Sequence, residues 1–279
     1  MRYRVMFARF PYKGAEHPDS TDWLVKTILE AKQNPLIEDV SFVRYDDTPI
    51  TMTRNMSIAQ AQKANVDFLC MLDSDMAPDY YLPANIQHHY PDSNAKPFWS
   101  SSLEFLIEQR AKGEPGMVAS PYCGPPPHEN VYVFHWINWE SETPNKFHKL
   151  NQFGREEAAR WKGIVEVAAL PTGLCLIDME ILKDMKPPYF YYEWMDKTES
   201  AKVSTEDVTF TRDVSMAGFG VYCNWDAWSG HWKAKCIGKP IPLTADDMRD
   251  TFREAVIKNQ RRNNKMVMVK AAKTPAKIP

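Results

Sequence analysis

The chain has 279 residues, of which 44% are hydrophobic, and a formal net charge of −2 at pH 7. This length suits one α/β unit with a sizeable core, and the near-neutral charge excludes a global attraction to nucleic acid or to a membrane surface. The N-terminal segment MRYRVMFARFPYKG is too charged to predict a signal peptide, and no apolar run approaches the roughly 18 residues that a membrane span needs.

The cysteines indicate a reducing compartment. They are odd in number and widely spaced, and three of them lie inside apolar runs, which is typical of small buried side chains rather than of disulfides or a zinc site. The five are Cys70, Cys123, Cys175, Cys223 and Cys236. We therefore expect a cytoplasmic protein with no membrane partner, and its oligomeric state stays open.

Strand and helix signals alternate along the first 120 residues, with about 30 to 40 residues to each unit. In chain order the sequence predicts a strand at 3–8, a helix capped at Ser20, Thr21 or Asp22, a strand at 40–45, a helix at 53–65, a strand at 68–73, a helix capped within 100–102 and ending at Gly113, and a strand at 117–120. This order predicts an α/β fold with a mostly parallel central sheet flanked by helices. Ligands of such sheets gather at the carboxyl ends of the strands.

The second half of the chain has a less regular pattern. Residues 121–162 are rich in aromatic side chains without a clear period. This pattern indicates a functional loop or lid. The alternative is a loop whose aromatic side chains only anchor it to the rest of the protein. After it the sequence predicts a strand pair at 164–170 and 171–177 joined by a glycine turn, a helix capped by Thr205 and closed by Gly218, a strand at 221–225, and a last helix from Thr244.

These signals predict one domain over residues 1–240, followed by a C-terminal helix and basic tail over 241–279. The nucleotide-binding half of the domain covers about 1–120 and the acceptor half about 121–240. The tail carries eight cationic residues over 252–279, and it is either a solvated terminal segment or a contact for a polyanion.

Two carboxylates stand at the end of the apolar run Phe68–Leu72. In a strand, residues i and i+2 point the same way, so Asp73 and Asp75 repel each other unless a cation lies beside them. The pattern therefore favours a cation at this strand end, although aspartate is also common where a strand turns.

Four elements in order carry a family resemblance: Asp73-Ser74-Asp75 after a strand, Thr172-Gly173 before an apolar strand, Thr205-Glu206-Asp207 at a helix start, and Gly230-His231 after a final strand. Together they resemble the GT-A superfamily of nucleotide-sugar glycosyltransferases, closest in style to family 2, over roughly residues 3 to 232. Met52-Thr53-Arg54-Asn55 is similar to the "R-N" element of that type. The resemblance implies a Rossmann-like GT-A fold and a metal-dependent sugar transfer from a nucleotide-diphosphate sugar.

For the metal, the resemblance implies Mn²⁺ or Mg²⁺, which neutralises the leaving diphosphate. Asp75 would be the direct ligand, His231 would complete the site, and Asp73 would reach the ribose or a metal-bound water. The alternative for His231 is a loop histidine beside its neighbouring tryptophans.

For the acceptor proton, the resemblance to the inverting members implies that Asp207 is the base, with Glu206 as the nearby alternate. Plain capping of the helix is the other interpretation, because acids favour its first turn.

For the donor, the resemblance implies a UDP-sugar or, as the alternative, a GDP-sugar. The expected contacts come from the ends of the first two strands, the first helix turn after them, the acidic turn and the glycine turn. They are Ala8, Arg9, Pro11, Asp46, Asp47, Arg54, Asp73, Ser74, Thr172 and Gly173. Arg9 and Arg54 could instead form surface salt bridges.

The acceptor is the least defined part. The resemblance implies hydroxymethylated pyrimidine in DNA as one acceptor, because small GT-A-like enzymes of phages glycosylate such bases. The basic tail and the aromatic segment favour DNA over any other single acceptor, because cations bind phosphates and aromatic rings stack on an extruded base. A soluble glycan, a protein or a small molecule is the alternative. Two rival classes also stay open: a non-catalytic protein that binds a sugar nucleotide or polyanion, and a nucleotidyltransferase, although residues 9–14 are not the glycine-rich phosphate loop that the latter normally needs.

Overall fold

A computed structural model describes residues 2–12, 15–46, 49–83, 91–124, 130–136, 150–194, 202–233 and 236–237. The chain divides into two compact units, Met1–Pro240 and Ile241–Pro279. The helix predicted from Thr244 and the basic tail belong to the second unit and lie outside the described residues.

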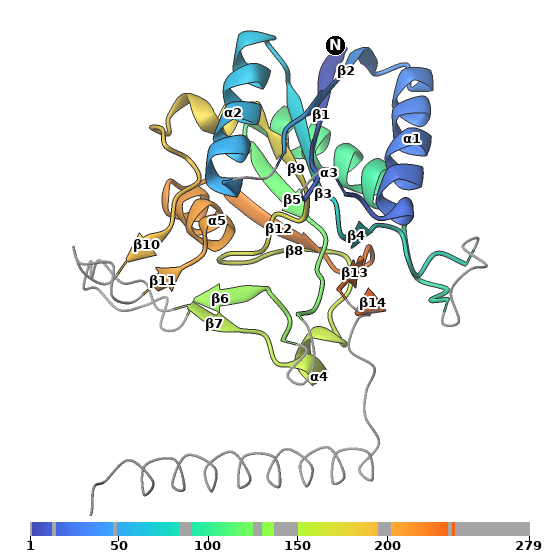
Figure 1. Cartoon of the computed structure of the whole chain (residues 1–279), viewed down its shortest axis with the longest axis vertical. Helices are drawn as coiled ribbons and strands as arrows, with labels where there is room; N and C mark the ends of the chain where they lie inside the picture. Colours follow the sequence, from blue (N-terminus) through green and yellow to red (C-terminus); the bar gives the residue numbers. More distant parts are fainter. Residues whose placement is uncertain are drawn as a thin grey trace, which may run out of the picture. The chain divides into compact units, whose positions relative to one another are not determined.

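A seven-stranded sheet forms the centre of the first unit (Figure 1). Its order is β2 (Ile37–Arg44), β1 (Tyr3–Phe10), β3 (Phe68–Asp73), β9 (Leu174–Asp178), β5 (Gly116–Ala119), β12 (Gly220–Asn224) and β8 (Ile164–Glu166). Five strands run in one direction, whereas β9 and β8 run antiparallel to their neighbours. The predicted α/β fold with a mostly parallel central sheet flanked by helices is confirmed.

Helices cover both faces of the sheet. The helices are α1 (Pro18–Gln33), α2 (Ile50–Lys63), α3 (Phe98–Lys112) and α5 (Glu206–Met216). Alternate residues of β1 show the two faces: Phe7 joins a core with Trp99 of α3, whereas Met6 joins a core with Ile58 of α2 and Phe210 of α5. In Figure 1, α2 and α5 lie to the left of the sheet and α1 to its right. Burial on both faces explains why β3 reads as a continuous apolar run.

Two helices begin earlier than their serine and threonine caps predict. α1 begins at Pro18, and its cap is His17, whose Nδ1 accepts a hydrogen bond from the Asp19 backbone N–H over 3.3 Å. α3 begins at Phe98, directly after Pro97. Proline suits the first helical position because its missing N–H has no partner there in any case.

The strand pair predicted across the glycine turn is wrong. β8 pairs with β12, while β9 lies between β3 and β5. β9 pairs on both of its edges and not with β8, its neighbour in sequence. Every residue of β9 is buried, as expected for a strand at the centre of a sheet that is covered on both faces.

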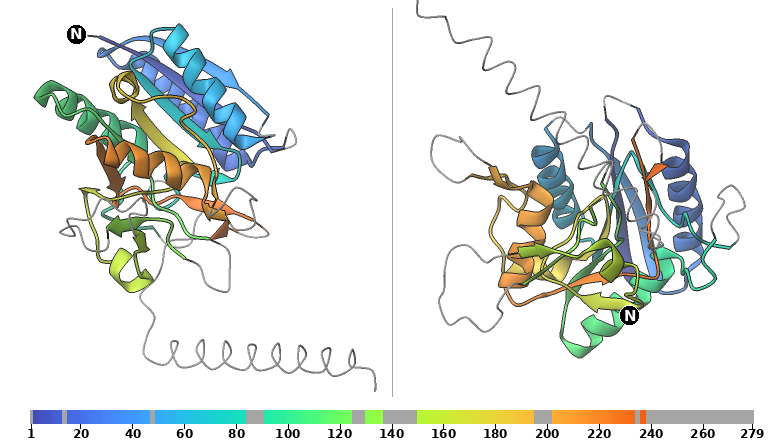
Figure 2. Two further views of the ribbon diagram at one scale, coloured as in Figure 1. Left: turned by 90° about the vertical axis from the view of Figure 1, so that its left-hand side faces the viewer. Right: turned by 90° about the horizontal axis from the view of Figure 1, so that it is seen from below.

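Three smaller sheets lie outside the central one. The first has three strands, β4 (Met76–Ala77), β13 (Gly230–Trp232) and β14 (Cys236–Ile237), and the other two are the pairs β6 (Phe134–Trp136) with β7 (Leu150–Gln152) and β10 (Glu193–Trp194) with β11 (Lys202–Ser204). Two short helices complete the unit, α4 (Arg155–Ala158) and the 3-10 helix η1 (Met179–Lys183). Figure 1 and the left view of Figure 2 place the β6–β7 ribbon beyond the carboxyl ends of the parallel strands. Part of the aromatic segment thus borders the edge where ligands are expected.

Two compositional predictions can be compared with the structure. Cys70, Cys123, Cys175 and Cys223 are buried free thiols, as their apolar neighbours predict, and the side chain of Cys236 lies outside the described part. Within the described ranges, no helix combines the length and apolar character needed to cross a membrane.

Candidate active site

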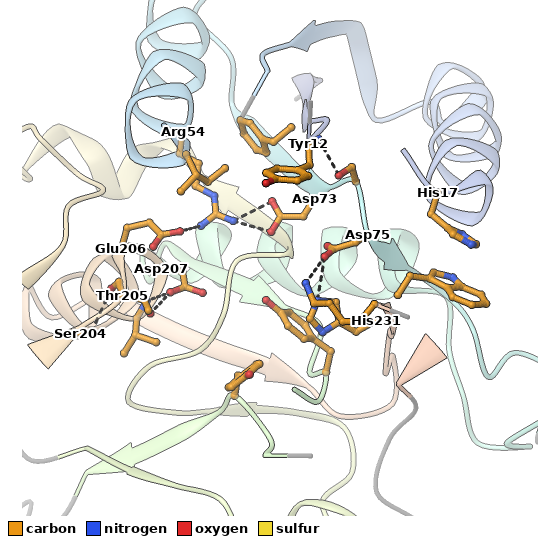
Figure 3. Close-up of a pocket in the computed structure, with 18 of the residues that line it drawn as sticks. Tyr12, His17, Arg54, Asp73, Asp75, Ser204, Thr205, Glu206, Asp207 and His231 are labelled. Atoms are coloured by element: carbon orange, nitrogen blue, oxygen red, sulfur yellow. Dashed lines mark hydrogen bonds and ion pairs between the residues drawn. The ribbon is translucent and has the colours of Figure 1, made fainter. Parts of the chain in front are cut away.

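A cavity of about 1280 Å³ lies at the carboxyl edge of the sheet. Its walls come from the ends of β1 and β3, the start of α5, the strand β13 and the β6–β7 ribbon (Figure 3). It brings together seven of the predicted site residues: Arg54, Asp73, Ser74, Asp75, Glu206, Asp207 and His231. These residues lie far apart in sequence and meet because the end of β3, the helices α2 and α5 and the strand β13 converge at one edge of the sheet.

Arg54 joins the acidic strand end to the start of α5. Its Nη2 lies 2.9 and 2.8 Å from the two carboxylate oxygens of Asp73, and its Nη1 lies 2.9 Å from Oε1 of Glu206. The Arg54 side chain is only 3% exposed. Burial lowers the pKa of Arg54, but the carboxylates of Asp73 and Glu206 outweigh burial and hold it above its ordinary value. Arg54 is therefore a permanent buried cation and not a surface salt-bridge residue.

The partners of Arg54 are also perturbed. Burial raises the pKa of Asp73 and of Glu206, and Arg54 opposes this in both. Both oxygens of Asp73 already accept hydrogen bonds from Arg54. This engagement favours a role for Asp73 in positioning or ribose contact over direct coordination of a metal.

Asp75 has a separate set of partners. Its Oδ2 lies 3.3 Å from Nε2 of His231 and 2.6 Å from Nζ of Lys233. Burial raises the pKa of Asp75, but the contacts with His231 and Lys233 outweigh burial and lower this pKa to about 2. The carboxylate is consequently ionised at any physiological pH.

The pairing of two short strands brings His231 to Asp75. In the β13–β4 pair, His231 lies opposite Met76, and the backbone N–H of Trp232 donates to the Asp75 carbonyl over 2.7 Å. Nδ1 of His231 lies 2.9 Å from the carbonyl oxygen of Cys123, which can only accept a hydrogen bond. Nδ1 therefore carries a proton. Nε2 faces Oδ2 of Asp75 over 3.3 Å: with a proton it donates to that oxygen, and without one it presents a lone pair beside it.

Asp207 combines a helix-start position with a place in the cavity wall. Its Oδ1 accepts hydrogen bonds from the Thr205 hydroxyl and, over 2.8 Å, from the Val208 backbone N–H. Figure 3 shows the carboxylate at the side of the cavity opposite Asp75 and His231. The capping interpretation thus accounts for Oδ1, while Oδ2 has no role in these bonds.

Four predicted donor residues do not line the cavity. Ala8 and Pro11 are buried, and Asp46 is exposed. Arg9 forms an ion pair with Glu16 and donates to the Thr21 hydroxyl over 3.3 Å. Their role in donor binding stays a prediction, and Asp47 lies outside the described residues.

The glycine turn braces the site from behind rather than lining it. The Gly173 carbonyl accepts from the Asp73 backbone N–H over 2.8 Å. A Cβ on Gly173 would lie 2.9 Å from the Tyr122 ring and from the Met76 sulfur, so a side chain has no room there. The Thr172 hydroxyl is buried and has no hydrogen-bond partner among the described residues. Ser74, by contrast, lines the cavity, and its Oγ accepts from the Tyr12 backbone N–H over 3.3 Å.

Several other residues line the cavity or contact its residues without belonging to a motif that the sequence shows. Tyr122 packs edge-on against His231 with ring centroids 4.8 Å apart, and His17 stacks on Trp232 at 4.0 Å. Others that line the cavity are Tyr12, Tyr132, Arg212 and Lys233. The only signal for Lys233 was its place two residues after the predicted metal ligand His231.

Comparisons with known proteins were made on sequence and on structure. No family model matches the chain, and no curated protein matches it in sequence. Among solved structures, A197 from STIV is 15% identical, with 88% of this chain and 97% of that chain covered and a TM-score of 0.49. GalNAc-T7 with UDP, GalNAc and Mn²⁺ is 13% identical (83% and 44% covered, TM-score 0.39), and apo-UDP-glucose pyrophosphorylase is 9% identical (94% and 100% covered, TM-score 0.38). This chain thus spans less than half of the GalNAc-T7 chain, and likenesses of this size place no activity on it.

Proposed function

We propose that the protein is a metal-dependent glycosyltransferase that moves a sugar from a nucleotide-diphosphate sugar to a hydroxyl group. The observation that carries the proposal is the pair formed by Asp75 and His231, 3.3 Å apart, in the same cavity as Asp207. At this spacing a carboxylate oxygen and an unprotonated imidazole nitrogen would provide two ligands for one cation. A carboxylate on the other side of the cavity supplies a base.

The donor set fits a divalent metal. Carboxylate oxygen suits Mg²⁺ and Mn²⁺, and Mn²⁺ also accepts imidazole nitrogen. Among the described residues, no group of three or more His, Cys, Asp and Glu side chains is arranged to hold a metal, so Asp75 and His231 would need diphosphate oxygens and waters as the other ligands. When bound, the metal would supply a positive charge that stabilises the leaving diphosphate. The Cys123 carbonyl keeps the His231 ring in the tautomer that this role requires.

Asp207 is the better base of the two acids at the start of α5. Oε1 of Glu206 is bound to Arg54, whereas the second oxygen of Asp207 is not engaged in the capping bonds. Asp207 would accept the proton of the acceptor hydroxyl. At the same time the hydroxyl oxygen would bond to the anomeric carbon of the sugar, and the bond from that carbon to the diphosphate would break. A single displacement of this kind inverts the anomeric centre, in agreement with a family 2-like enzyme.

The donor class is the one that the resemblance implies, and the acceptor rests on the resemblance, the basic tail and the aromatic segment. We propose a UDP-sugar as donor, with a GDP-sugar as the alternative, and DNA bearing a hydroxymethylated pyrimidine as acceptor. Tyr132 and Phe134 belong to the aromatic segment and line the cavity. A base of the acceptor could stack on these side chains, and a sugar ring could do so equally well. The basic tail that supports DNA lies outside the described residues.

The test is a panel of UDP-, GDP- and dTDP-sugars incubated with the full chain, with and without Mn²⁺. We expect Mn²⁺-dependent release of nucleoside diphosphate from at least one donor, and suppression by EDTA. Binding of a sugar nucleotide without any turnover would make the protein a binding module. Formation of a nucleoside triphosphate from a sugar nucleotide and pyrophosphate would make it a nucleotidyltransferase.

A further inference from the structure

Lys233 occupies a special place in the cavity. It follows β13 directly, and its Nζ lies 2.6 Å from Oδ2 of Asp75, the same atom that faces Nε2 of His231. The Lys233 side chain is 45% exposed, so its ammonium group stays in contact with solvent while it neutralises the carboxylate. The chain itself thus supplies a cation to the Asp75 carboxylate.

An ammonium group and a divalent cation compete for this position. Both need a lone pair of Asp75 Oδ2, and two cations that approach one oxygen repel each other strongly at such short range. The two are not equivalent, because an ammonium only donates hydrogen bonds, whereas a metal forms coordinate bonds to several oxygen and nitrogen ligands at once. Lys233 must therefore leave Asp75 when a metal binds there.

The displaced ammonium has a suitable new partner in the substrate class proposed above. Lysine carries its charge on a flexible four-carbon stem, and Lys233 lines the cavity in which the donor would bind. The diphosphate is an anion, whereas the carboxylates of Asp73 and Glu206 are already paired with Arg54.

We propose that Lys233 is a stand-in cation, which holds Asp75 while the site is empty and transfers to the diphosphate of the donor when metal and donor bind. This inference rests on the proposed function. Metal that binds alone must then break the contact between Lys233 and Asp75 and offers Lys233 no new partner. Metal that binds together with the donor offers Lys233 the diphosphate instead. The two ligands should consequently bind cooperatively, through a coupling that Lys233 carries.

The test measures binding rather than turnover. Free Mn²⁺ is followed by electron paramagnetic resonance during titration of the full chain, first with Mn²⁺ alone and then with saturating UDP. We expect Lys233→Gln to bind Mn²⁺ alone about tenfold more tightly than the unaltered chain, and to lose most of the enhancement by UDP, which lies within the about 5- to 150-fold typical of such couplings. Its affinity for UDP in saturating Mn²⁺ should fall.

A matched control is available on the surface. Lys183 forms an ion pair of the same length, 2.6 Å, with Glu180 and does not line the cavity, so Lys183→Gln should leave every constant unchanged. If Lys233→Gln binds Mn²⁺ alone equally or less tightly, while the unaltered chain binds it, the stand-in role is overturned and the proposed metal site survives. If no variant binds Mn²⁺ even with UDP, the proposed metal site falls, and the stand-in role with it.

Discussion

Asp73 and Asp75 are two residues apart at one strand end, yet their carboxylates are neutralised by different cations. Arg54 binds both oxygens of Asp73, whereas Lys233 and His231 contact a single oxygen of Asp75. The Arg54 guanidinium is buried, whereas the Lys233 side chain is 45% exposed. Each acid thus has its own cation, which relieves the expected repulsion between the two carboxylates.

This difference predicts that Asp75→Ala abolishes metal-dependent turnover and preserves the fold. We expect the rate of donor hydrolysis or transfer to fall by about 100-fold or more, because the variant lacks the proposed metal ligand. Circular dichroism should show an unchanged fold, since the side chain is 36% exposed. Full activity in this variant, or activity indifferent to EDTA in the unaltered chain, would end the metal-site interpretation.

The two acids at the start of α5 should behave differently. Asp207→Asn removes the proposed base and should lower transfer by about 10²- to 10⁴-fold while donor binding stays normal, because a base acts in the chemical step. Glu206→Gln is the matched comparison, since it weakens the contact with Arg54 and leaves Asp207 in place. The rate constants and donor affinities of both variants show whether Asp207 acts in the chemical step or in donor binding. Loss of donor affinity in Asp207→Asn, with normal turnover of bound substrate, would make Asp207 a binding residue.

Arg54 should contribute strongly to stability. Arg54→Leu leaves Asp73 and Glu206 without their buried cation, and we expect the free energy of unfolding to fall by about 3–5 kcal/mol. Arg54→Lys keeps the charge but not the geometry of three hydrogen bonds, so its loss should be smaller. Urea denaturation measures both. A loss below about 1 kcal/mol in Arg54→Leu would show that the triad is not a stabilising unit.

Asp79 should give the unfolding free energy a measurable pH dependence. Its oxygens accept from the Trp23 indole and the Phe98 backbone N–H, each over 2.7 Å, but burial outweighs both bonds and raises the pKa of Asp79 to about 6. A carboxyl group whose pKa is higher in the folded state stabilises the fold when protonated, so its contribution is full below about pH 4 and is lost as pH rises to about 6.

The variant Asp79→Asn isolates this contribution, because asparagine does not titrate and tolerates the positive φ of 56° at this position. The stability of the unaltered chain relative to the variant should fall by on the order of 1–2 kcal/mol between pH 4 and pH 6. Chemical denaturation across that range measures the difference. A difference that does not change with pH would contradict the raised pKa.

The proposed DNA acceptor predicts salt-dependent binding. Each phosphate contact releases a counterion, so the affinity for a DNA duplex should fall steeply between about 50 and 200 mM salt. A chain that ends before residue 258 lacks seven of the eight tail cations and should bind more weakly with a shallower salt dependence. Fluorescence anisotropy with a labelled duplex provides the measurement. Absent or salt-insensitive binding by the intact protein would return the acceptor to the soluble glycans, proteins or small molecules.

By itself the sequence determined the elements that depend on neighbours along the chain. The apolar run ending at Asp73 is β3, Thr205 precedes α5, and Gly218 follows that helix with a φ of +87°. The α/β order predicted the sheet, and the resemblance selected Asp75, Asp207 and His231, which do share one cavity. Periodicity, caps and turn residues act over a few positions, which is why such features can be read without a structure.

Tertiary structure alone decided which strands pair and which charges meet. The central antiparallel place of β9 and the crossing of β13 with β4 depend on contacts between segments far apart in sequence, and the same contacts set Lys233 against Asp75 and Arg54 against Glu206. Arg9, which the sequence favoured for the donor, pairs with Glu16 instead of lining the cavity. A carboxylate binds whichever cation the packed chain holds within a few ångströms, and that choice is made by long-range packing rather than by local pattern.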